Sequence, residues 1–270
     1  MNQVAELGGR PMPASVERGD LTSGSDRLDS VDIKVTFSGA GAAAATRALA
    51  PDIGGARRRV YFCEALARST APGQLPLLDA GLILRLRAGS GRGGAATAEL
   101  WPCRRSRLSE RWLRFREQGP DSFHLADAWS GDRRVLSAAL VSDCGRTAVE
   151  AAATGAQPLE LVFSDRQRAF LADCADITFG FGSLNILGPV HTVRWHGVRL
   201  DHHEVTLERW TLGRAADPTL EWLEVSKRVS PEGAEVVQAS LTALLRAQGL
   251  DPDLDSGFRV RQVLEALAAT

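Results

Sequence analysis

The stretch that decides the fold is "GLILRLRAGSG", residues 81–91, which reads as a β-strand that ends in a glycine-rich turn. Successive side chains of a strand point to opposite faces, so the leucines from Leu82 to Leu86 share one face while Arg85 and Arg87 share the other. Two neighbouring arginines repel each other unless water or an anion lies between them. This face is therefore either the solvated side of a sheet or a surface that holds a ligand.

Strands with the same alternation lie on both sides of this stretch. Eight further segments read as strands: 30–37, 58–66, 96–104, 122–129, 133–143, 188–198, 203–213 and 220–229. The turn 130–132 joins the fourth and fifth of them as a hairpin. Because no regular alternation of strands and helices occurs, the order predicts an antiparallel α+β domain.

Helices are predicted where the apolar spacing changes to the helical period. The segments are 41–52, 163–175, 231–249 and 257–268, and residues 105–118 read as a charged helix or an ordered insertion. In the second of these segments Ser164 is a suitable N-cap, and Gln167 stands where a capping box requires its partner.

Composition limits the class of protein. The 270 residues carry 32 Lys and Arg against 33 Asp and Glu, a formal net charge of −1 that gives no bulk attraction to nucleic acid or to an anionic membrane. Residues 1–28 are polar and predict a disordered tail, followed by a single domain over 29–270. No apolar run reaches the length of a membrane span, the N-terminus lacks the apolar core of a signal peptide, and the four scattered cysteines suit reduced thiols. A cytoplasmic location is the expectation.

Several of the predicted strands combine an apolar face with a face of mixed charges. A single strand of this kind is explained by an antiparallel sheet with one solvated face. A curved sheet built from many such strands often closes into a barrel with the polar face inside. An interior of arginine, lysine and carboxylates would suit a polyphosphate held by cations and by metal-bound acids.

The same segments resemble the CYTH proteins, the triphosphate tunnel metalloenzymes. "RRVYFCEALARSTAPGQLPLLDAGLILRLR" (58–87) is similar to the family segment in which Tyr-Phe-Asp-Thr leads to Leu-x-x-x-Gly-x-x-Leu-Arg-x-Arg. "TAELWPCR" (97–104) resembles the Thr-x-Lys-Leu-Arg-Pro strand, most of all in actinobacterial members. The resemblance runs over roughly residues 30–268. It implies a tunnel of eight antiparallel strands that binds a triphosphate with basic side chains and with Mg²⁺ or Mn²⁺ held by glutamates.

Some matched positions keep the family's charge. Arg85 and Arg87 match the pair that grips phosphate, and Lys34 matches the lysine of the opening Glu-x-Glu-x-Lys strand. The acidic-basic pair corresponds to Glu208 and Arg209. By the same resemblance the metal ligands would be Asp32, Glu208 and Glu224.

Other matched positions have lost the family's charge. The first glutamate of the opening strand is Ser30, and a family lysine is replaced by Glu99 with Trp101 after it. The Lys-x-Glu-x-Asp strand carries His124, Ala126 and Ala128. These losses argue against ordinary two-metal triphosphate hydrolysis and make the expected tunnel more apolar.

The expected function is therefore that of a diverged, repurposed tunnel enzyme. Lys34, Arg85, Arg87, Trp101 and Arg209 would bind a di- or triphosphate or another acidic amphiphile. The acid–base groups would be Glu99, His124, Asp32 and Glu208, acting in a cyclisation, elimination or isomerisation.

Three alternatives stay open. The first is a metal-dependent phosphohydrolase that uses Mg²⁺ or Mn²⁺, and the second is a non-catalytic protein that binds an anionic metabolite. The third is a structural or partner-binding role. As the bland alternative at the site itself, Glu99 pairs with Arg85 or Arg87 and leaves an inert, charge-balanced barrel. The sequence leaves the oligomeric state undetermined.

A histidine-rich segment lies apart from these residues. His202 and His203 are adjacent, so on a strand they would point to opposite faces, and a shared metal is not expected. The segment reads as a surface turn. "GSGRGG" (89–94) lacks the lysine of a phosphate-binding loop and reads as a hairpin loop.

Overall fold

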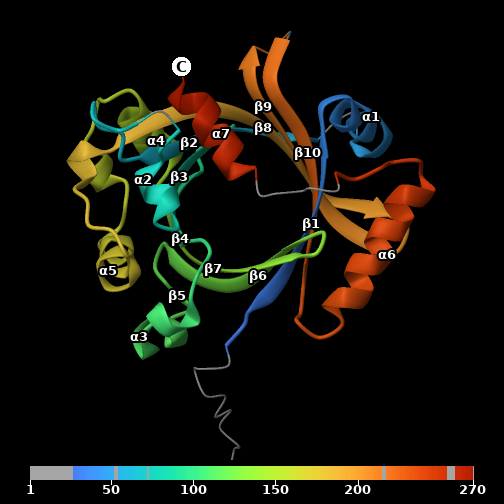
Figure 1. Ribbon diagram of the computed structural model, residues 1–270, viewed down its shortest axis with the longest axis horizontal. Coiled ribbons are helices and arrows are strands. Elements are labelled where there is room, and N and C mark those ends of the chain that lie inside the picture. Colours follow the sequence, from blue (N-terminus) through green and yellow to red (C-terminus); the bar gives the residue numbers. More distant parts are fainter. Residues whose placement is uncertain (1–26, 52–53, 72, 215–216, 254–258, 270) are drawn as a thin grey trace, which may run out of the picture.

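The computed structural model describes residues 27–51, 54–71, 73–214, 217–253 and 259–269, with side-chain burial omitted for 214–219. Its strands form one curved sheet that closes into a barrel (Figure 1). Ten strands are present in the described ranges: β1 (Ser30–Ser38), β2 (Ala56–Glu64), β3 (Leu82–Gly89), β4 (Gly94–Leu100), β5 (Glu117–Gln118), β6 (Asp121–Ser130), β7 (Arg133–Asp143), β8 (Asn185–Leu200), β9 (His203–Arg214) and β10 (Asp217–Val229).

The barrel contains nine of these strands. Their order is β1-β10-β9-β8-β2-β3-β4-β7-β6, and a pairing of β1 with β6 closes the ring, while β5 adds to β6 outside it. All neighbours are antiparallel except β1 and β6, which are parallel. The expectation of eight antiparallel strands is wrong in this detail. Directions that alternate around a ring return in phase only when the number of strands is even, so a ring of nine must contain one parallel pair.

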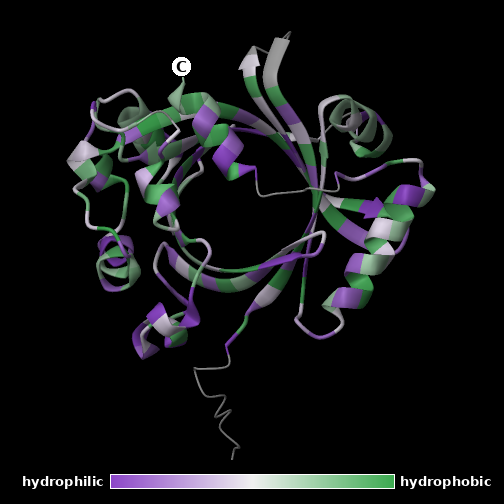
Figure 2. Cartoon of the chain, viewed as in Figure 1, coloured by the Kyte–Doolittle hydropathy of each residue, from purple (hydrophilic) through white to green (hydrophobic). Residues whose placement is uncertain are grey.

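Helices cover the outside of the barrel in two groups (Figure 1). The first group, with two short elements, is α2 (Pro76–Asp79), α3 (Glu110–Arg114), α4 (Arg146–Ala153) and α5 (Asp165–Cys174), and the second is α1 (Gly39–Leu49) and α6 (Ala234–Ala247). Each group encloses its own apolar cluster against the outer face of the strands. In Figure 2 the strands are striped with hydrophilic and hydrophobic colours, as expected for two faces with different neighbours.

The C-terminal helix packs against the barrel beside the other helices. Helix α7 (Val260–Ala268) places Val263 and Leu264, which are 1% and 2% exposed, against a third apolar cluster that includes Phe62 and Trp222. An ion pair of 2.5 Å from Arg261 to Asp79 fastens the helix to α2. Helix α7 therefore extends the barrel wall with an apolar surface.

Helix α5 begins as predicted. The Gln167 backbone N–H donates to the Ser164 hydroxyl, and the Ser164 N–H donates to the Gln167 side-chain oxygen, each at 3.1 Å. Gln167 is fully buried, and its side-chain nitrogen also donates to Ala96 and Leu140 carbonyls at 2.9 Å. The capping box is thus confirmed, and it also fastens the helix to β4 and β7.

The remaining predictions differ from the structure in where elements begin and end. Residues 1–26 lie outside the described residues, but Arg27, which the sequence assigned to the tail, is 8% exposed and donates to the Phe115 carbonyl at 2.6 Å. Within 105–118 the structure has a 3-10 turn at Arg105–Arg107 and the five-residue helix α3 in place of one long helix, and α4 was not foreseen. No helix in the described ranges combines the length and apolarity that crossing a membrane requires.

Candidate functional site

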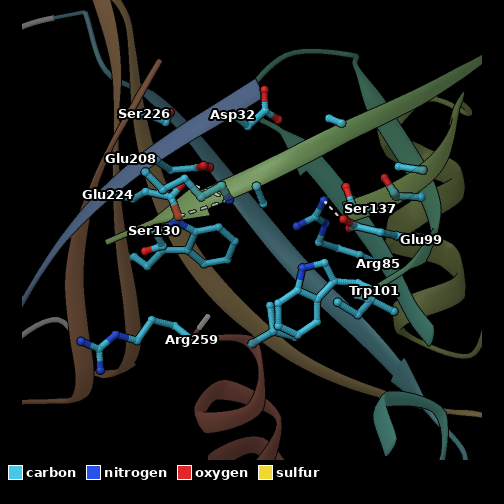
Figure 3. Close-up of a pocket in the computed structure, with 18 of the residues that line it drawn as sticks. Asp32, Arg85, Glu99, Trp101, Ser130, Ser137, Glu208, Glu224, Ser226 and Arg259 are labelled. Atoms are coloured by element: carbon cyan, nitrogen blue, oxygen red, sulfur yellow. Dashed lines mark hydrogen bonds and ion pairs between the residues drawn. The ribbon is translucent and has the colours of Figure 1, made fainter. Parts of the chain in front are cut away.

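The register of β3 decides which face of the barrel carries the arginines. Leu82, Leu84 and Leu86 are at most 1% exposed and belong to the apolar cluster under α4 and α5, outside the barrel. The alternate face, with Arg85 and Arg87, therefore turns inward and lines a cavity of about 430 Å³ in the barrel (Figure 3). The inner face of this strand is not the solvated side of an open sheet.

A group of arginines gathers on one side of this cavity. Arg85 lies 3.8 Å from Glu99, a long ion pair in which both side chains are 17% exposed, and the Arg85 Nε is buried without a partner in the described part of the chain. Arg87 has no hydrogen bond or ion pair to any described residue. Burial, followed by the charges of Arg85 and Arg194, lowers the pKa of Arg87 to about 9. The positive charge here is only partly neutralised.

Arg194, on β8, enlarges this group and was not predicted. It lines the cavity, and its Nε is buried with no hydrogen-bond acceptor among the described residues. Burial and the Arg194 charge together lower the pKa of Arg58 on the neighbouring strand β2. The alternation in "HTVRWHGV" would have placed Thr192 and Arg194 on one face, but not which face is inside.

The opposite side of the cavity is acidic. Glu208 on β9 and Glu224 on β10 face each other as cross-strand partners, and Figure 3 shows them together across the cavity from Arg85. Lys34 lies 3.4 Å from Glu224, and this carboxylate raises the lysine pKa despite the effect of burial. The inner wall thus joins a cationic and an acidic side.

The three predicted metal ligands do not converge on one ion. Asp32 accepts two hydrogen bonds from Arg228, at 2.7 and 2.9 Å, and Glu224 is engaged by Lys34. In the described ranges no three His, Cys, Asp or Glu side chains are arranged to hold a metal. The residues present therefore do not fit a three-carboxylate metal site, and a divalent ion would need further oxygens from its ligand.

Two groups suited to proton transfer also face the cavity. Glu99 on β4 and His124 on β6 both flank Ala139 of the intervening strand β7, so they share the inner face two strands apart. Burial and the charge of Arg228 lower the pKa of His124, which keeps its imidazole neutral at pH 7. A neutral imidazole can accept a proton from a ligand bound beside it.

The rest of the wall is aromatic and apolar. Trp210 and Trp222 stack with ring centroids 5.3 Å apart and an interplanar angle of 9°. Trp101, Phe62 and, from α7, Val263 line the same cavity. The cavity therefore has a charged part and an apolar part.

The structure brings most predicted site residues together. The cavity is lined by Asp32, Lys34, Arg85, Arg87, Glu99, Trp101, His124, Glu208 and Glu224. Arg209 is not among the lining residues, and it instead donates to Glu221 at 2.6 Å. Because Arg209 directly follows the inward-facing Glu208, its side chain leaves from the other face of the strand. Sequence reasoning also missed Trp210 and Trp222.

Comparisons with known proteins agree with the barrel. No family model matches the chain, and no curated protein matches it. A solved structure from Hippeastrum, described as the putative adenylyl cyclase HpAC1 with a dominant triphosphatase activity, aligns over 88% of this chain and 96% of its own. The TM-score is 0.54 at 12% identity. The chain has a CYTH-like tunnel fold.

Two archaeal structures align over similar lengths of this tunnel-fold chain. The PH1819 protein from Pyrococcus horikoshii OT3 covers 87% of the chain and 99% of its own, with a TM-score of 0.42 and 10% identity. The PH1012 protein from the same organism covers 83% and 95%, with a TM-score of 0.38 and 15% identity.

Proposed function

We propose that this tunnel-fold protein binds an organic phosphate, or a similarly acidic small molecule, that carries an apolar body. The observation that carries the proposal is Arg87, a cation inside the barrel, beside two further arginines, without an ion pair in the described part of the chain. Desolvating an unpaired cation is unfavourable, and a bound anion would remove that penalty.

The arrangement of the arginines suits a phosphate head. Arg85 and Arg194 each keep a buried Nε–H that no described residue accepts, and a guanidinium can donate two parallel hydrogen bonds to phosphate oxygens. Glu99 does not neutralise the group, because its single contact with Arg85 is 3.8 Å long. The hypothesis of an inert, charge-balanced barrel is thus less well supported than the binding of an anion.

The apolar part of the cavity suits the body of the same ligand. The stacked pair Trp210 and Trp222, with Trp101, offers aromatic surface on which an apolar chain or ring can pack. A volume of about 430 Å³ lies in the range of small-molecule sites. A simple triphosphate would leave this surface uncovered.

Chemistry on such a ligand would use Glu99 and His124. The neutral imidazole would accept a proton from the ligand's body, and the Glu99 carboxylate would hold or return one, without any metal-bound nucleophile. This pattern fits a cyclisation, elimination or isomerisation in small-molecule biosynthesis. The proposal describes a diverged tunnel protein that keeps the family's phosphate-binding arginines.

A second function, metal-dependent phosphohydrolysis, is favoured by one observation. Glu208 and Glu224 face each other across paired strands, and two carboxylates with phosphate oxygens can complete the coordination of one Mg²⁺ or Mn²⁺. Loss of Lys34, which occupies Glu224, would then strengthen metal binding.

A thermal-shift panel separates these functions. The probes are inorganic triphosphate, farnesyl diphosphate and farnesol, each with and without Mg²⁺. A ligand at a hundredfold its Kd stabilises the fold by about 2.7 kcal/mol. We expect farnesyl diphosphate to stabilise the protein without metal and farnesol to have little effect. Stabilisation by triphosphate only with Mg²⁺ would favour the hydrolase, and no response to any phosphate probe would contradict the proposal.

Two matched variants test the cationic group. Arg87→Met should weaken farnesyl diphosphate binding about tenfold to a hundredfold, as expected for loss of a charged hydrogen-bond donor. Arg57→Met is the control, because Arg57 is an exposed arginine on the adjacent strand β2. Calorimetric titration gives both dissociation constants, and equal losses in the two variants would remove the cavity as the binding site.

A further inference from the structure

A second group of reactive side chains lies where the β8–β9 turn meets helix α6. His202 Nδ1 is 2.7 Å from the Asp201 carboxylate, and His202 Nε2 is 3.2 Å from the Ser240 hydroxyl. His203 Nε2 approaches the same hydroxyl at 3.0 Å. Two imidazoles thus converge on one serine.

With both imidazoles in the neutral form, the chemistry of the end groups assigns a direction to every hydrogen bond. A carboxylate only accepts, so His202 Nδ1–H donates to Asp201, and the bare Nε2 of His202 accepts the Ser240 O–H. At the other end Lys227 only donates, at 3.4 Å, so His203 Nδ1 accepts and His203 Nε2–H donates to the Ser240 oxygen. A single donor path runs from Lys227 to Asp201 and passes through Ser240.

Along this path Ser240 has a base in His202, a carboxylate in Asp201 that orients this base, and a hydrogen-bond donor in His203. The signature of an activated nucleophile is a base within hydrogen-bond reach of the hydroxyl and a third group that orients the base. His202 and Asp201 fill these positions for Ser240. His203 adds a hydrogen bond to the Ser240 oxygen, and the positive charge behind it is that of the Lys227 ammonium, which contacts the far side of the His203 ring.

The backbone holds the two ends of the group in place. Asp201 adopts φ +54° in the two-residue turn that joins the paired residues Leu200 and His203, a conformation that Asp tolerates better than most residues. Ser240 is fixed on α6, whose next residue Leu241 is fully buried in the apolar cluster against the barrel. The His202 and Asp201 side chains are 64% and 67% exposed, so a reagent can reach them.

We infer that Ser240 is a nucleophile activated by His202 and Asp201, and that this surface site accepts the acyl group of a small activated ester. Ser240 Oγ bonds to the acyl carbon as its proton passes to His202 Nε2. The bond to the leaving oxygen then breaks, and that oxygen takes the proton. Water next gives a proton to His202 and attacks the acyl carbon, and Ser240 regains its hydrogen as the acid leaves.

A fluorophosphonate reagent tests the nucleophile directly, because the serine oxygen displaces fluoride and keeps a phosphonyl group that peptide mass spectrometry locates. We expect Ser240 to be labelled at least tenfold faster than Ser183, an exposed serine whose hydroxyl donates only to the Gly180 carbonyl. Labelling of Ser240 no faster than Ser183 would overturn the inference.

Conservative variants separate activation from a structural role. His202→Gln should slow labelling of Ser240 about a hundredfold, the lower end of what a positioned base supplies, and Asp201→Asn, which only orients the base, about tenfold. Both side chains are exposed and Asn tolerates the Asp201 backbone angle, so the melting temperature should not change. p-Nitrophenyl acetate hydrolysis should fall in parallel and vanish in Ser240→Ala. Labelling at an unchanged rate in both variants would show that the group only fastens the turn to α6.

Discussion

Arg87 is a cation inside the barrel that has no hydrogen bond or ion pair to a described residue. It shares the inner face of β3 with Arg85, and Arg194 from β8 adds a third guanidinium nearby. Burial and these like charges all disfavour its ionised form, which is why its pKa falls. A side chain that weakens the empty protein in this way fits a binding role better than a structural one.

This conflict predicts that Arg87→Met makes the empty protein more stable. Methionine keeps much of the volume and removes the desolvation penalty, so the free energy of unfolding should rise by about 1–3 kcal/mol. For a chain of this size that corresponds to roughly 2–4 °C in melting temperature per kcal/mol. Thermal unfolding without ligand measures it, and a lower melting temperature would show that Arg87 is a structural ion-pair partner.

Residue alternation explains which sequence predictions succeeded at this scale. Arg85 and Arg87 are two positions apart, so they had to share a face, and both line the cavity. Glu208 and Arg209 are adjacent, so they could not share one, and Arg209 instead pairs with Glu221. The resemblance assigned both residues to the site. Because adjacent residues of a strand point to opposite faces, only one of them can line the cavity.

At the scale of elements, the sequence predicted those helices whose own residues carry a local signal. Ser164 and Gln167 predicted the start of α5, because a capping box is a contact between residues only three positions apart. Helix α4 follows Gly145, which has φ +79°, and it lacks a capping side chain, so no such signal preceded it. Helix α7 was predicted from its amphipathic pattern, but its position against the barrel was not.

The buried face of α7 should contribute strongly to stability. Leu264→Ala removes a side chain that is 2% exposed in the third apolar cluster, which typically lowers the free energy of unfolding by about 2–4 kcal/mol. Gln262→Ala, on the exposed side of the same helix, should change it by less than about 0.5 kcal/mol. Urea denaturation compares the two, and similar small losses would mean that the packing of α7 on this cluster contributes little to stability.

At the scale of the whole molecule, the pH response is set by histidines that the fold keeps neutral. Burial lowers the pKa of both His124 and His203 below the usual 6.5, with Arg228 adding to the effect at the first and His202 and Lys227 at the second. As pH falls through 6.5 the unfolded chain binds protons that the folded chain does not yet bind. Stability contributed by these groups is therefore present above pH 6.5 and lost as pH falls toward their folded pKa values.

Stability should accordingly fall between pH 7.5 and pH 5.5. Because His124 keeps contact with the cavity's solvent, its share is a few tenths to about 1 kcal/mol. Chemical denaturation at several pH values measures this slope, and His124→Gln should flatten it. A slope that stays unchanged in the variant would mean that His124 titrates normally in the folded protein.

The sequence by itself determined the strands, their alternating faces and the capping box, because each depends on contacts between residues a few positions apart. It contained nine strand-like stretches, while the resemblance supplied the number eight. Only the tertiary structure decided that β1 closes the ring by a parallel pairing with β6, and that Arg194, Trp210 and Trp222 join the cavity. It alone also brought Ser240 of α6 to the turn that carries His202. The physical reason is register: which face is inside depends on pairings between segments far apart in the chain, and local alternation is the same for either choice.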